Sequence, residues 1–83
     1  MKRWYCYLAR CADGTYYCGV SNDVAARFRS HNAGKGARYT RSRLPVKLVW
    51  KKRVLDKSAA LKLEHAVKQM TRAQKHKLVQ AAR

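Results

Sequence analysis

Aromatic and apolar residues dominate two short segments near the start of the chain, residues 3–10 and 15–20. The dipeptide Asp13-Gly14 separates them and is a strong local signal for a turn between antiparallel strands. The pattern therefore predicts a β-hairpin over residues 3–20.

The length of this turn decides which side chains share a face of the hairpin. A two-residue turn at Asp13-Gly14 would place Tyr7 and Tyr17 on opposite faces. A three-residue loop over residues 12–14, with Gly14 left-handed in a bulge, would bring both tyrosines to one face. If the two phenols serve one site, we expect the three-residue loop.

A helix is predicted to follow the hairpin. Residues 21–23 (Ser-Asn-Asp) offer helix caps ahead of residues 24–31, in which Val24 and Phe28 should face the sheet. Residues 32–43 are polar, basic and contain glycine, so we expect a loop that Pro45 ends.

The rest of the chain predicts one strand and two helices. Residues 46–50 have the pattern of a third strand. Asp56 or Ser58 should cap a helix that runs to about residue 69, and Thr71 should open a last helix that reaches the C-terminus. The order ββαβαα predicts an α+β domain with a small, mainly antiparallel three-stranded sheet. A chain of 83 residues is enough for one such domain with one modest core.

The charge of the chain indicates its partner. Twenty Lys and Arg face four Asp and Glu, a formal net charge of +16. Such an excess attracts polyanions, so nucleic acid is the first partner expected, in a complex that salt weakens. The basic residues are spread along the chain, which argues against a membrane-surface helix. We see no charged-then-apolar leader and no long apolar run, and therefore expect neither secretion nor a membrane span.

The three cysteines are Cys6, Cys11 and Cys18. An odd number without an export signal predicts reduced thiols in a cytoplasmic protein. A zinc site would need a fourth ligand and a Cys-x-x-Cys spacing, which is absent. We expect Cys6 and Cys18 to fill space on the inner face of the hairpin.

Glu64 is the chain's only glutamate. The other acids lie where turns or caps place them: Asp13, Asp23 and Asp56. Glu64 is three residues from both Leu61 and Val67, so it should border the apolar face of its helix. An ion pair with a nearby Lys or Arg and ligation of a metal are both open. Mg²⁺ often takes only one or two protein carboxylates, with water and phosphate completing its shell. A one-metal site is therefore compatible with this chain, and a two-metal site is not expected.

Four other side chains suit work on a phosphodiester. Arg27 and His31 lie one helical turn apart and form either a solvated basic face or a site. In a site, the guanidinium would bind a phosphate and the imidazole would exchange a proton near neutral pH. Tyr7 and Tyr17 are either ordinary strand aromatics or catalytic phenols. A phenol has a pKa of about 10 and must be lowered before it acts as a base, and we expect the surrounding positive charge to lower it.

Taken in order, these residues resemble the GIY-YIG endonuclease domain, and in particular its compact single-domain bacterial branch, related to the nuclease modules of the UvrC repair protein and of a structure-specific nuclease. Residues 5–7 (Tyr-Cys-Tyr) match the first tripeptide and residues 17–19 (Tyr-Cys-Gly) the second. Residues 27–41 and Glu64 continue the match, which runs from about residue 4 to residue 74. Tyr5 replaces the family's first glycine, and cysteines replace both central isoleucines. These departures concern packing and local strand geometry.

The resemblance implies hydrolysis of a DNA strand with one divalent cation, Mg²⁺ or Mn²⁺, held by Glu64. It implies that Tyr7 activates the attacking water and that Tyr17 orients the water or phosphate, with His31 close by. Arg27 would stabilise the charge of the transition state. The loop from residue 34 to residue 43, if it is more than a solvated basic loop, would bind DNA through four residues: Lys35, Arg38, Tyr39 and Arg41.

The alternative is a non-catalytic module that binds DNA or RNA on the same fold, including a ribosome-associated protein. Such a module has no use for Glu64, whose charge opposes an anionic ligand. For an endonuclease we expect preference for a DNA structure, branched or single-stranded, over preference for a sequence, and a role in DNA repair or processing. The chain leaves open the preferred structure, the oligomeric state and the need for a targeting protein.

Overall fold

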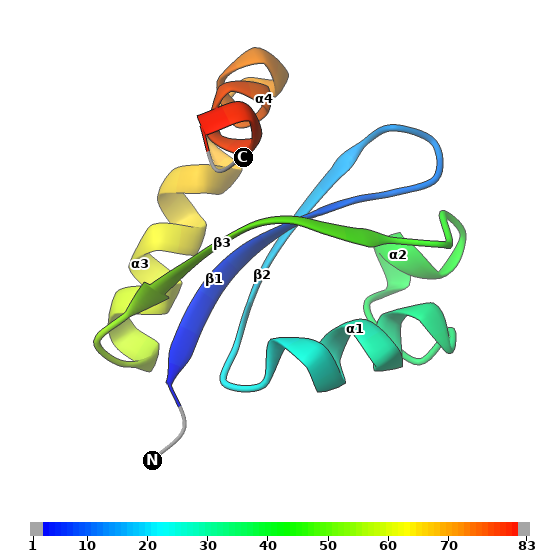
Figure 1. The fold of residues 1–83 in the computed structure, drawn as a ribbon, viewed down its shortest axis with the longest axis horizontal. Coiled ribbons are helices and arrows are strands. Elements are labelled where there is room, and N and C mark those ends of the chain that lie inside the picture. Colours follow the sequence, from blue (N-terminus) through cyan, green and yellow to red (C-terminus); the bar gives the residue numbers. More distant parts are fainter. Residues whose placement is uncertain (1–2, 82–83) are drawn as a thin grey trace.

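The computed structural model describes residues 3–81 (Figure 1). Its elements are β1 Trp4–Arg10, β2 Tyr16–Ser21, α1 Val24–Asn32, α2 Arg38–Arg41, β3 Lys47–Val54, α3 Lys57–Lys68 and α4 Arg72–Ala81. This confirms the predicted α+β class and the order ββαβαα, with one addition. The segment predicted to be a loop contains the single-turn helix α2, in which the Ala37 carbonyl accepts hydrogen bonds from Thr40 N and Arg41 N.

The hairpin has the loop that a shared tyrosine site requires. Cys11 N donates to Thr15 O at 2.8 Å, and Gly14 N donates to Cys11 O at 2.9 Å. Gly14 has a φ of 85°, the left-handed conformation that glycine adopts without strain. The register that follows pairs Tyr7 with Gly19 and Ala9 with Tyr17. Because side chains alternate along a strand, the pairing confirms that the two tyrosines share one face.

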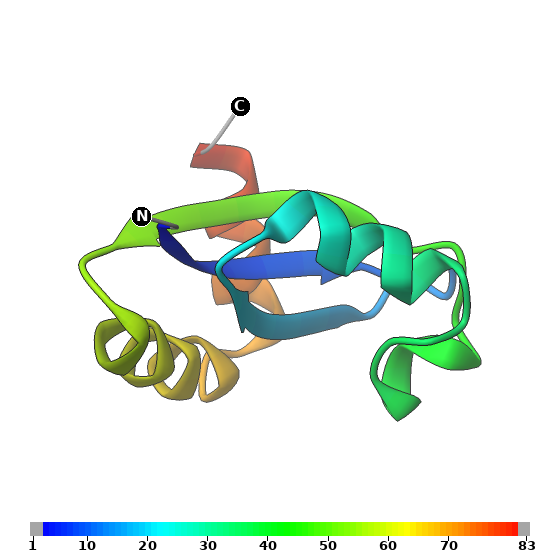
Figure 2. The same cartoon turned by 90° about the horizontal axis from the view of Figure 1, so that it is seen from below.

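The sheet has the order β2-β1-β3, with both outer strands antiparallel to β1. Helices α1 and α2 lie on one side of it and α3 and α4 on the other (Figures 1 and 2). β3 is longer than predicted and continues through Lys51, Lys52 and Arg53, which pair with β1. Lysine and arginine are common on exposed edge strands, so charge did not mark the end of this one.

Each face of the sheet has its own apolar cluster. The α3/α4 side buries Cys6, Leu8 and Cys18 against residues of the two helices, which confirms the predicted role of Cys6 and Cys18. The α1/α2 side buries Tyr7 and Ala9 together with Cys11 and Val46, and the half-buried Tyr17, Phe28, Leu44 and Leu48 pack against them. Both tyrosines of the candidate site therefore belong to the α1 side.

The helix starts follow the predicted caps. Asp23 Oδ1 accepts a hydrogen bond from Ala26 N at 3.1 Å, and Asp56 Oδ1 accepts from Ala59 N at 2.8 Å. Asp56, and not Ser58, is thus the cap of α3. Within the described part of the chain, no helix is both long and apolar enough to cross a membrane.

Candidate active site

A chain of three buried polar side chains lies beneath α1. The Tyr7 hydroxyl is 3.0 Å from His31 Nε2, and His31 Nδ1 is 3.0 Å from Thr40 Oγ1. The Thr40 hydroxyl donates to the Ala37 carbonyl at 2.9 Å. Tyr7 is 1% exposed, and His31 and Thr40 are 0% exposed.

The last turn of α1 carries His31 into the core. Phe28, one turn earlier, packs edge-on against the Tyr7 ring with 5.1 Å between ring centroids. His31 itself is fully buried. A solvated basic face is therefore wrong for His31. Gly36 makes the burial feasible, because a Cβ there would lie 2.8 Å from the His31 Cα.

The glycine of the second tripeptide makes room for the phenol of the first. Tyr7 and Gly19 are cross-strand partners. A Cβ on Gly19 would lie 2.5 Å from the Tyr7 hydroxyl oxygen, a distance that real Cβ contacts essentially never show. The two tripeptides are thus linked by packing, and any larger residue at position 19 must displace Tyr7.

Tyr17 and Arg27 complete the cluster. The Tyr17 ring centroid is 6.4 Å from that of Tyr7 and 5.5 Å from that of His31. Burial opposes the charge of Arg27, but its contacts with the Tyr7 and Tyr17 phenols outweigh burial and raise the pKa of Arg27. The structure thus brings together four of the five predicted catalytic residues, from β1, β2 and α1.

The protonation states of the cluster differ from the expectation. Burial raises the pKa of Tyr7 to about 12, and the Arg27 charge offsets this only in part. Arg27 thus lowers this pKa, as expected of a neighbouring cation, but burial has the larger effect and the pKa of Tyr7 rises on balance. Burial, and then the Arg27 charge, lower the pKa of His31 below its ordinary 6.5. At neutral pH the phenol is protonated and the imidazole is neutral.

The hairpin turn holds Tyr39 against Tyr17. Arg43 Nε pairs with Asp13 Oδ2 at 2.9 Å, and the Arg43 guanidinium lies 4.0 Å from the centroid of the Tyr39 ring. The Tyr39 ring in turn stacks on Tyr17 at 6.0 Å and 25°. Tyr39 was predicted to bind nucleic acid, and in this structure it also covers a candidate catalytic phenol. The other three residues predicted to bind DNA are all exposed, on the loop and on α2: Lys35, Arg38 and Arg41.

Glu64 lies on α3, which covers the other face of the sheet. Its carboxylate is 3.6 Å from Lys68 Nζ, and its side chain is 20% exposed. The ion pair that the sequence left open is thus present. Of its two predicted apolar neighbours, Val67 is fully buried and Leu61 is 44% exposed, so Glu64 borders the apolar face of α3 on the Val67 side.

A hollow at the edge strand β2 lies between the ion pair of Glu64 and the tyrosine cluster. Lys68, the partner of Glu64, lines this hollow of about 210 Å³. The hollow is lined by Tyr16, Tyr17, Cys18, Tyr39, Lys68 and Lys75. We call it the β2-edge hollow. It exposes Tyr17 beside two ammonium groups, a setting that suits a phosphate.

Among the described residues, no three or more His, Cys, Asp or Glu side chains lie close enough together to hold a metal ion as a group. Glu64 supplies one half-buried carboxylate, and a Mg²⁺-like ion that keeps most of its water shell needs only one or two from the protein. Glu64 is therefore a sufficient ligand only for a one-ion site.

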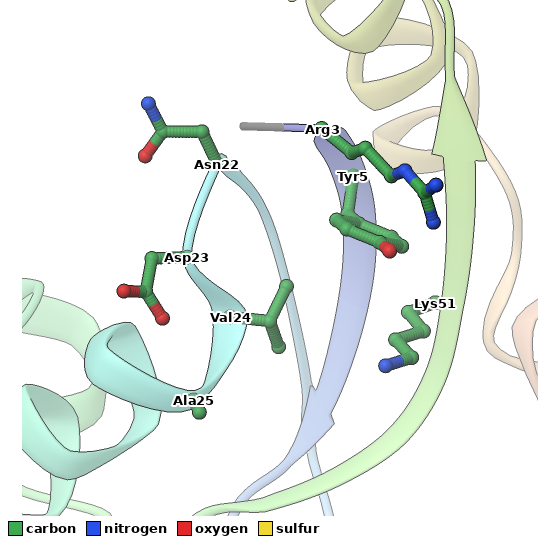
Figure 3. A pocket seen from close by; sticks show the side chains of 7 residues that line it. All are labelled: Arg3, Tyr5, Asn22, Asp23, Val24, Ala25 and Lys51. Atoms are coloured by element: carbon green, nitrogen blue, oxygen red, sulfur yellow. The ribbon is translucent and has the colours of Figure 1, made fainter. Parts of the chain in front are cut away.

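A second hollow of about 480 Å³ lies between the start of α1 and the strands. Figure 3 shows Tyr5 between Arg3 and Lys51, with Asn22 and Asp23 across the opening. It contains none of the predicted catalytic residues, and Asp23 brings a carboxylate that already caps α1. We therefore place the candidate site at the tyrosine cluster and not in the larger hollow.

Sequence reasoning missed Thr40, Arg43, Lys68 and Lys75. Thr40 follows a tyrosine in a basic segment, and nothing in the local pattern indicates that its hydroxyl is buried. Lys68 is four residues after Glu64, a spacing that places two side chains on one helix face and could have identified it. Arg43 and Lys75 contact the site through tertiary structure alone.

The chain matches one family model, several relatives and solved structures. A family model described as the GIY-YIG catalytic domain matches residues 3–77. A UPF0213 protein of Desulfotalea psychrophila is 48% identical over 80 residues, which cover 95% of this chain and 73% of the relative. One of Staphylococcus epidermidis is 46% identical over 80 residues, covering 96% and 98%. The solution NMR structure of a UPF0213 protein from Bacillus halodurans is 39% identical, covers 95% of this chain and 84% of that one, and has a TM-score of 0.60.

Proposed function

The chain belongs to the GIY-YIG catalytic domain family, and on this premise we propose that residues 1–83 form a single-domain, metal-dependent endonuclease that hydrolyses DNA phosphodiester bonds. The family is one of nucleases, so nucleic acid is the substrate class. The three cysteines are free thiols, which suits work in the cytoplasm, in DNA repair or processing.

One observation carries the proposal: a buried tyrosine hydroxyl bonded to a neutral histidine, with an arginine beside it. The Tyr7 oxygen lies 3.0 Å from His31 Nε2, and Arg27 contacts Tyr7 and Tyr17. A surface that only binds polyanions needs exposed cations and gains nothing from burying a histidine among phenols. Proton transfer beside a phosphate gives each of these groups a purpose.

The chemistry follows from the protonation states. With a pKa of about 12, Tyr7 is not a preformed base. It can take a proton from the attacking water only if its own hydroxyl proton passes to His31 Nε2. The water then loses one proton, Tyr7 remains a phenol, and His31 becomes an imidazolium that returns its proton to solvent after cleavage. Tyr17 orients the water or phosphate, and Arg27 stabilises the charge developing on phosphorus oxygens.

Glu64 is the residue that would hold a divalent cation, Mg²⁺ or Mn²⁺. Such an ion supplies Lewis-acid stabilisation of the phosphate and of the leaving oxygen. Lys68 holds the carboxylate in the free protein and would be released from it when a cation binds.

The substrate would be recognised through its backbone. Five basic residues would contact its phosphates: Lys35, Arg38 and Arg41, which are exposed, and Lys68 and Lys75, which line the β2-edge hollow. Phosphate contacts carry no sequence information, so we propose preference for a DNA structure, branched or single-stranded, and selection of the target by a partner protein.

A non-catalytic nucleic-acid-binding module is the second candidate, and one observation favours it. The Glu64–Lys68 ion pair gives the carboxylate a structural partner that needs no metal. A binding module would keep stable complexes with DNA or RNA and show no dependence on a metal ion.

The deciding experiment incubates the purified protein with single-stranded, branched and duplex DNA in Mg²⁺, Mn²⁺ or EDTA. We expect cleavage of at least one DNA that needs the metal and is abolished in Glu64→Ala and Tyr7→Phe. Tyr5→Phe is the matched control, since Tyr5 lies two residues earlier on the same strand, outside the cluster. If no DNA is cut, or if Glu64→Ala and Tyr7→Phe cut as fast as the control, the protein is a binding module.

A further inference from the structure

We propose that Thr40 is a positioning residue that fixes the tautomer of His31 and thereby the direction in which the Tyr7 hydroxyl donates its proton. The tautomer is a property of the folded protein alone. Its consequence for catalysis rests on the proposed function.

The first step concerns the Thr40 hydroxyl. Thr40 Oγ1 lies 2.9 Å from the Ala37 carbonyl oxygen. A carbonyl oxygen carries no hydrogen, so two oxygens this close require the hydroxyl hydrogen between them. The same carbonyl accepts Thr40 N at 3.1 Å and Arg41 N at 3.2 Å, which anchors it within α2. Thr40 therefore donates to the backbone.

The second step concerns the imidazole. A threonine hydroxyl has one hydrogen, and here it is already donated to Ala37. The 3.0 Å contact between Thr40 Oγ1 and His31 Nδ1 must then use an N–H of the ring. A neutral imidazole has only one N–H, and His31 is fully buried beside the Arg27 charge, which favours the neutral form. The proton is thus on Nδ1, and Nε2 is bare.

The third step concerns the phenol. With Nε2 bare, its 3.0 Å contact with the Tyr7 oxygen is a hydrogen bond that Tyr7 donates. The phenol hydrogen points to His31, and the oxygen lone pairs are left for Arg27 and for an approaching water. In the other tautomer Nε2–H would occupy the Tyr7 oxygen, and the phenol proton would have no histidine to receive it. Thr40 therefore decides whether the proton relay can run.

Close packing around the His31 ring supports a fixed orientation of the imidazole. Gly36 packs directly on His31, and a Cβ there would lie 2.8 Å from the His31 side-chain Cγ. Phe28 packs edge-on against the same ring with 5.7 Å between centroids. The imidazole is therefore held from two sides, and its tautomer is set by its two hydrogen-bond partners.

The test is ¹⁵N NMR of the histidine side chains, in which a protonated and a bare ring nitrogen have distinct shifts and couplings. We expect His31 in the unaltered protein and in Thr40→Ser to show Nδ1 protonated and Nε2 bare. Thr40→Val, which has the same shape without a hydroxyl, should lose this preference. A bare Nδ1 in the unaltered protein, or an unchanged His31 in Thr40→Val, overturns the proposal. If Thr40→Val does not fold, the spectrum of the unaltered protein still decides the tautomer.

The catalytic consequence is measured separately. Thr40→Val should lower kcat by about 10- to 100-fold, the range known for metal-ligating histidines that lose their outer hydrogen-bond partner, with KM nearly unchanged. Thr40→Ser should recover most of the rate. Equal kcat in Thr40→Val and the unaltered protein would overturn the catalytic role. If the unaltered protein cuts no DNA, the proposed nuclease function fails while the tautomer result stands by itself.

Discussion

At the residue scale, Gly19 links the two tyrosine tripeptides, because its lack of a side chain leaves room for the Tyr7 ring. Gly19 lies beneath the Tyr7 hydroxyl, and the Tyr7–His31 hydrogen bond requires that the phenol stay there. Tyr5 and the two central cysteines depart from the family's tripeptides. Other side chains are accepted at these three positions because none of them takes part in the contact between Gly19 and the Tyr7 hydroxyl. The glycine at position 19 and the two tyrosines are the parts of the tripeptides that the geometry requires.

Gly19→Ala should therefore damage the site more than the fold. The added Cβ meets the Tyr7 oxygen at 2.5 Å, so the phenol must move away from His31. We expect about 1–3 kcal/mol lower stability, the usual cost of overpacking, and nearly complete loss of cleavage. Thermal unfolding and DNA cleavage measure the two effects.

Gly34→Ala is the control, because nothing lies within 4 Å of a Cβ at Gly34 and its cost is that of a positive φ alone. If Gly19→Ala keeps full cleavage activity, the close packing of Gly19 on Tyr7 does not matter for the chemistry.

The buried histidine predicts how stability depends on pH. The pKa of His31 is lowered by burial in the folded state, below the 6.5 of an unfolded histidine. The unfolded chain therefore binds the proton more readily, and stability falls as the pH drops below about 6.5, by up to about 1.4 kcal/mol per pH unit. Urea unfolding between about pH 7 and pH 5 should show a smaller decrease in His31→Gln than in the unaltered protein. His65→Gln, at an exposed position, serves as the control, and a parallel fall in all three proteins would contradict the assignment.

At the element scale, the hairpin was predictable in detail and the connection after α1 was not. Asp13-Gly14 and the demand for a shared tyrosine face together predicted the three-residue loop. Residues 32–43 carry no apolar period, so the pattern predicted only a loop. Their order in the structure comes from hydrogen bonds to residues distant in sequence, such as that of Thr40 with His31, and no local signal indicates such contacts.

Asn32 is the clearest of these distant contacts. Its side-chain amide accepts from Val46 N at 2.8 Å and donates to Val46 O at 3.1 Å. It thus joins the end of α1 to the residue before β3, in the manner of a strand neighbour. Val46 is buried, and both hydrogen bonds are part-buried at the border of the core.

Asn32→Ala should destabilise the protein by about 1–3 kcal/mol, because it leaves the Val46 N–H and C=O without partners. For a domain of this size, each kcal/mol corresponds to roughly 4–8 °C in Tm. Asn22→Ala is the matched control, since Asn22 is an exposed asparagine ahead of α1. Equal Tm values for the two variants would show that the Asn32 link carries no stability.

At the scale of the whole molecule, the net charge indicates the kind of partner, and the positions of the residues indicate where it would bind. A net charge of +16 predicted a polyanionic partner, but it could not say where that partner lies. The four catalytic candidates on the α1 side followed from the sequence, because tripeptides and helix spacing place them by local rules. Glu64 is on the helix that covers the opposite face, and its ion-pair partner Lys68 lines the β2-edge hollow together with Tyr17. Under the proposed function we therefore expect the phosphate to bind at the edge of β2, where Tyr17, Lys68 and Lys75 line one hollow.

This placement predicts a graded salt dependence of DNA binding. Removing one lysine–phosphate interaction should reduce the slope of log K against log salt by about one for duplex DNA and somewhat less for a single strand. Binding measured by fluorescence anisotropy in EDTA, where no cleavage competes, should show this reduction for Lys75→Ala. The affinity should fall less in Lys75→Ala than in Lys68→Ala, because removal of Lys68 also leaves the Glu64 carboxylate unpaired and facing the DNA.

Lys62→Ala is the comparison that separates position from charge. Lys62 is exposed on the same helix as Lys68 but does not line the β2-edge hollow. All three variants remove one positive charge, so a general field effect would weaken binding equally in each of them. A larger decrease in Lys75→Ala than in Lys62→Ala requires direct binding at the hollow. Equal decreases would mean that DNA is held by the overall field of the protein, and that the strand to be cut approaches Tyr17 from a different side.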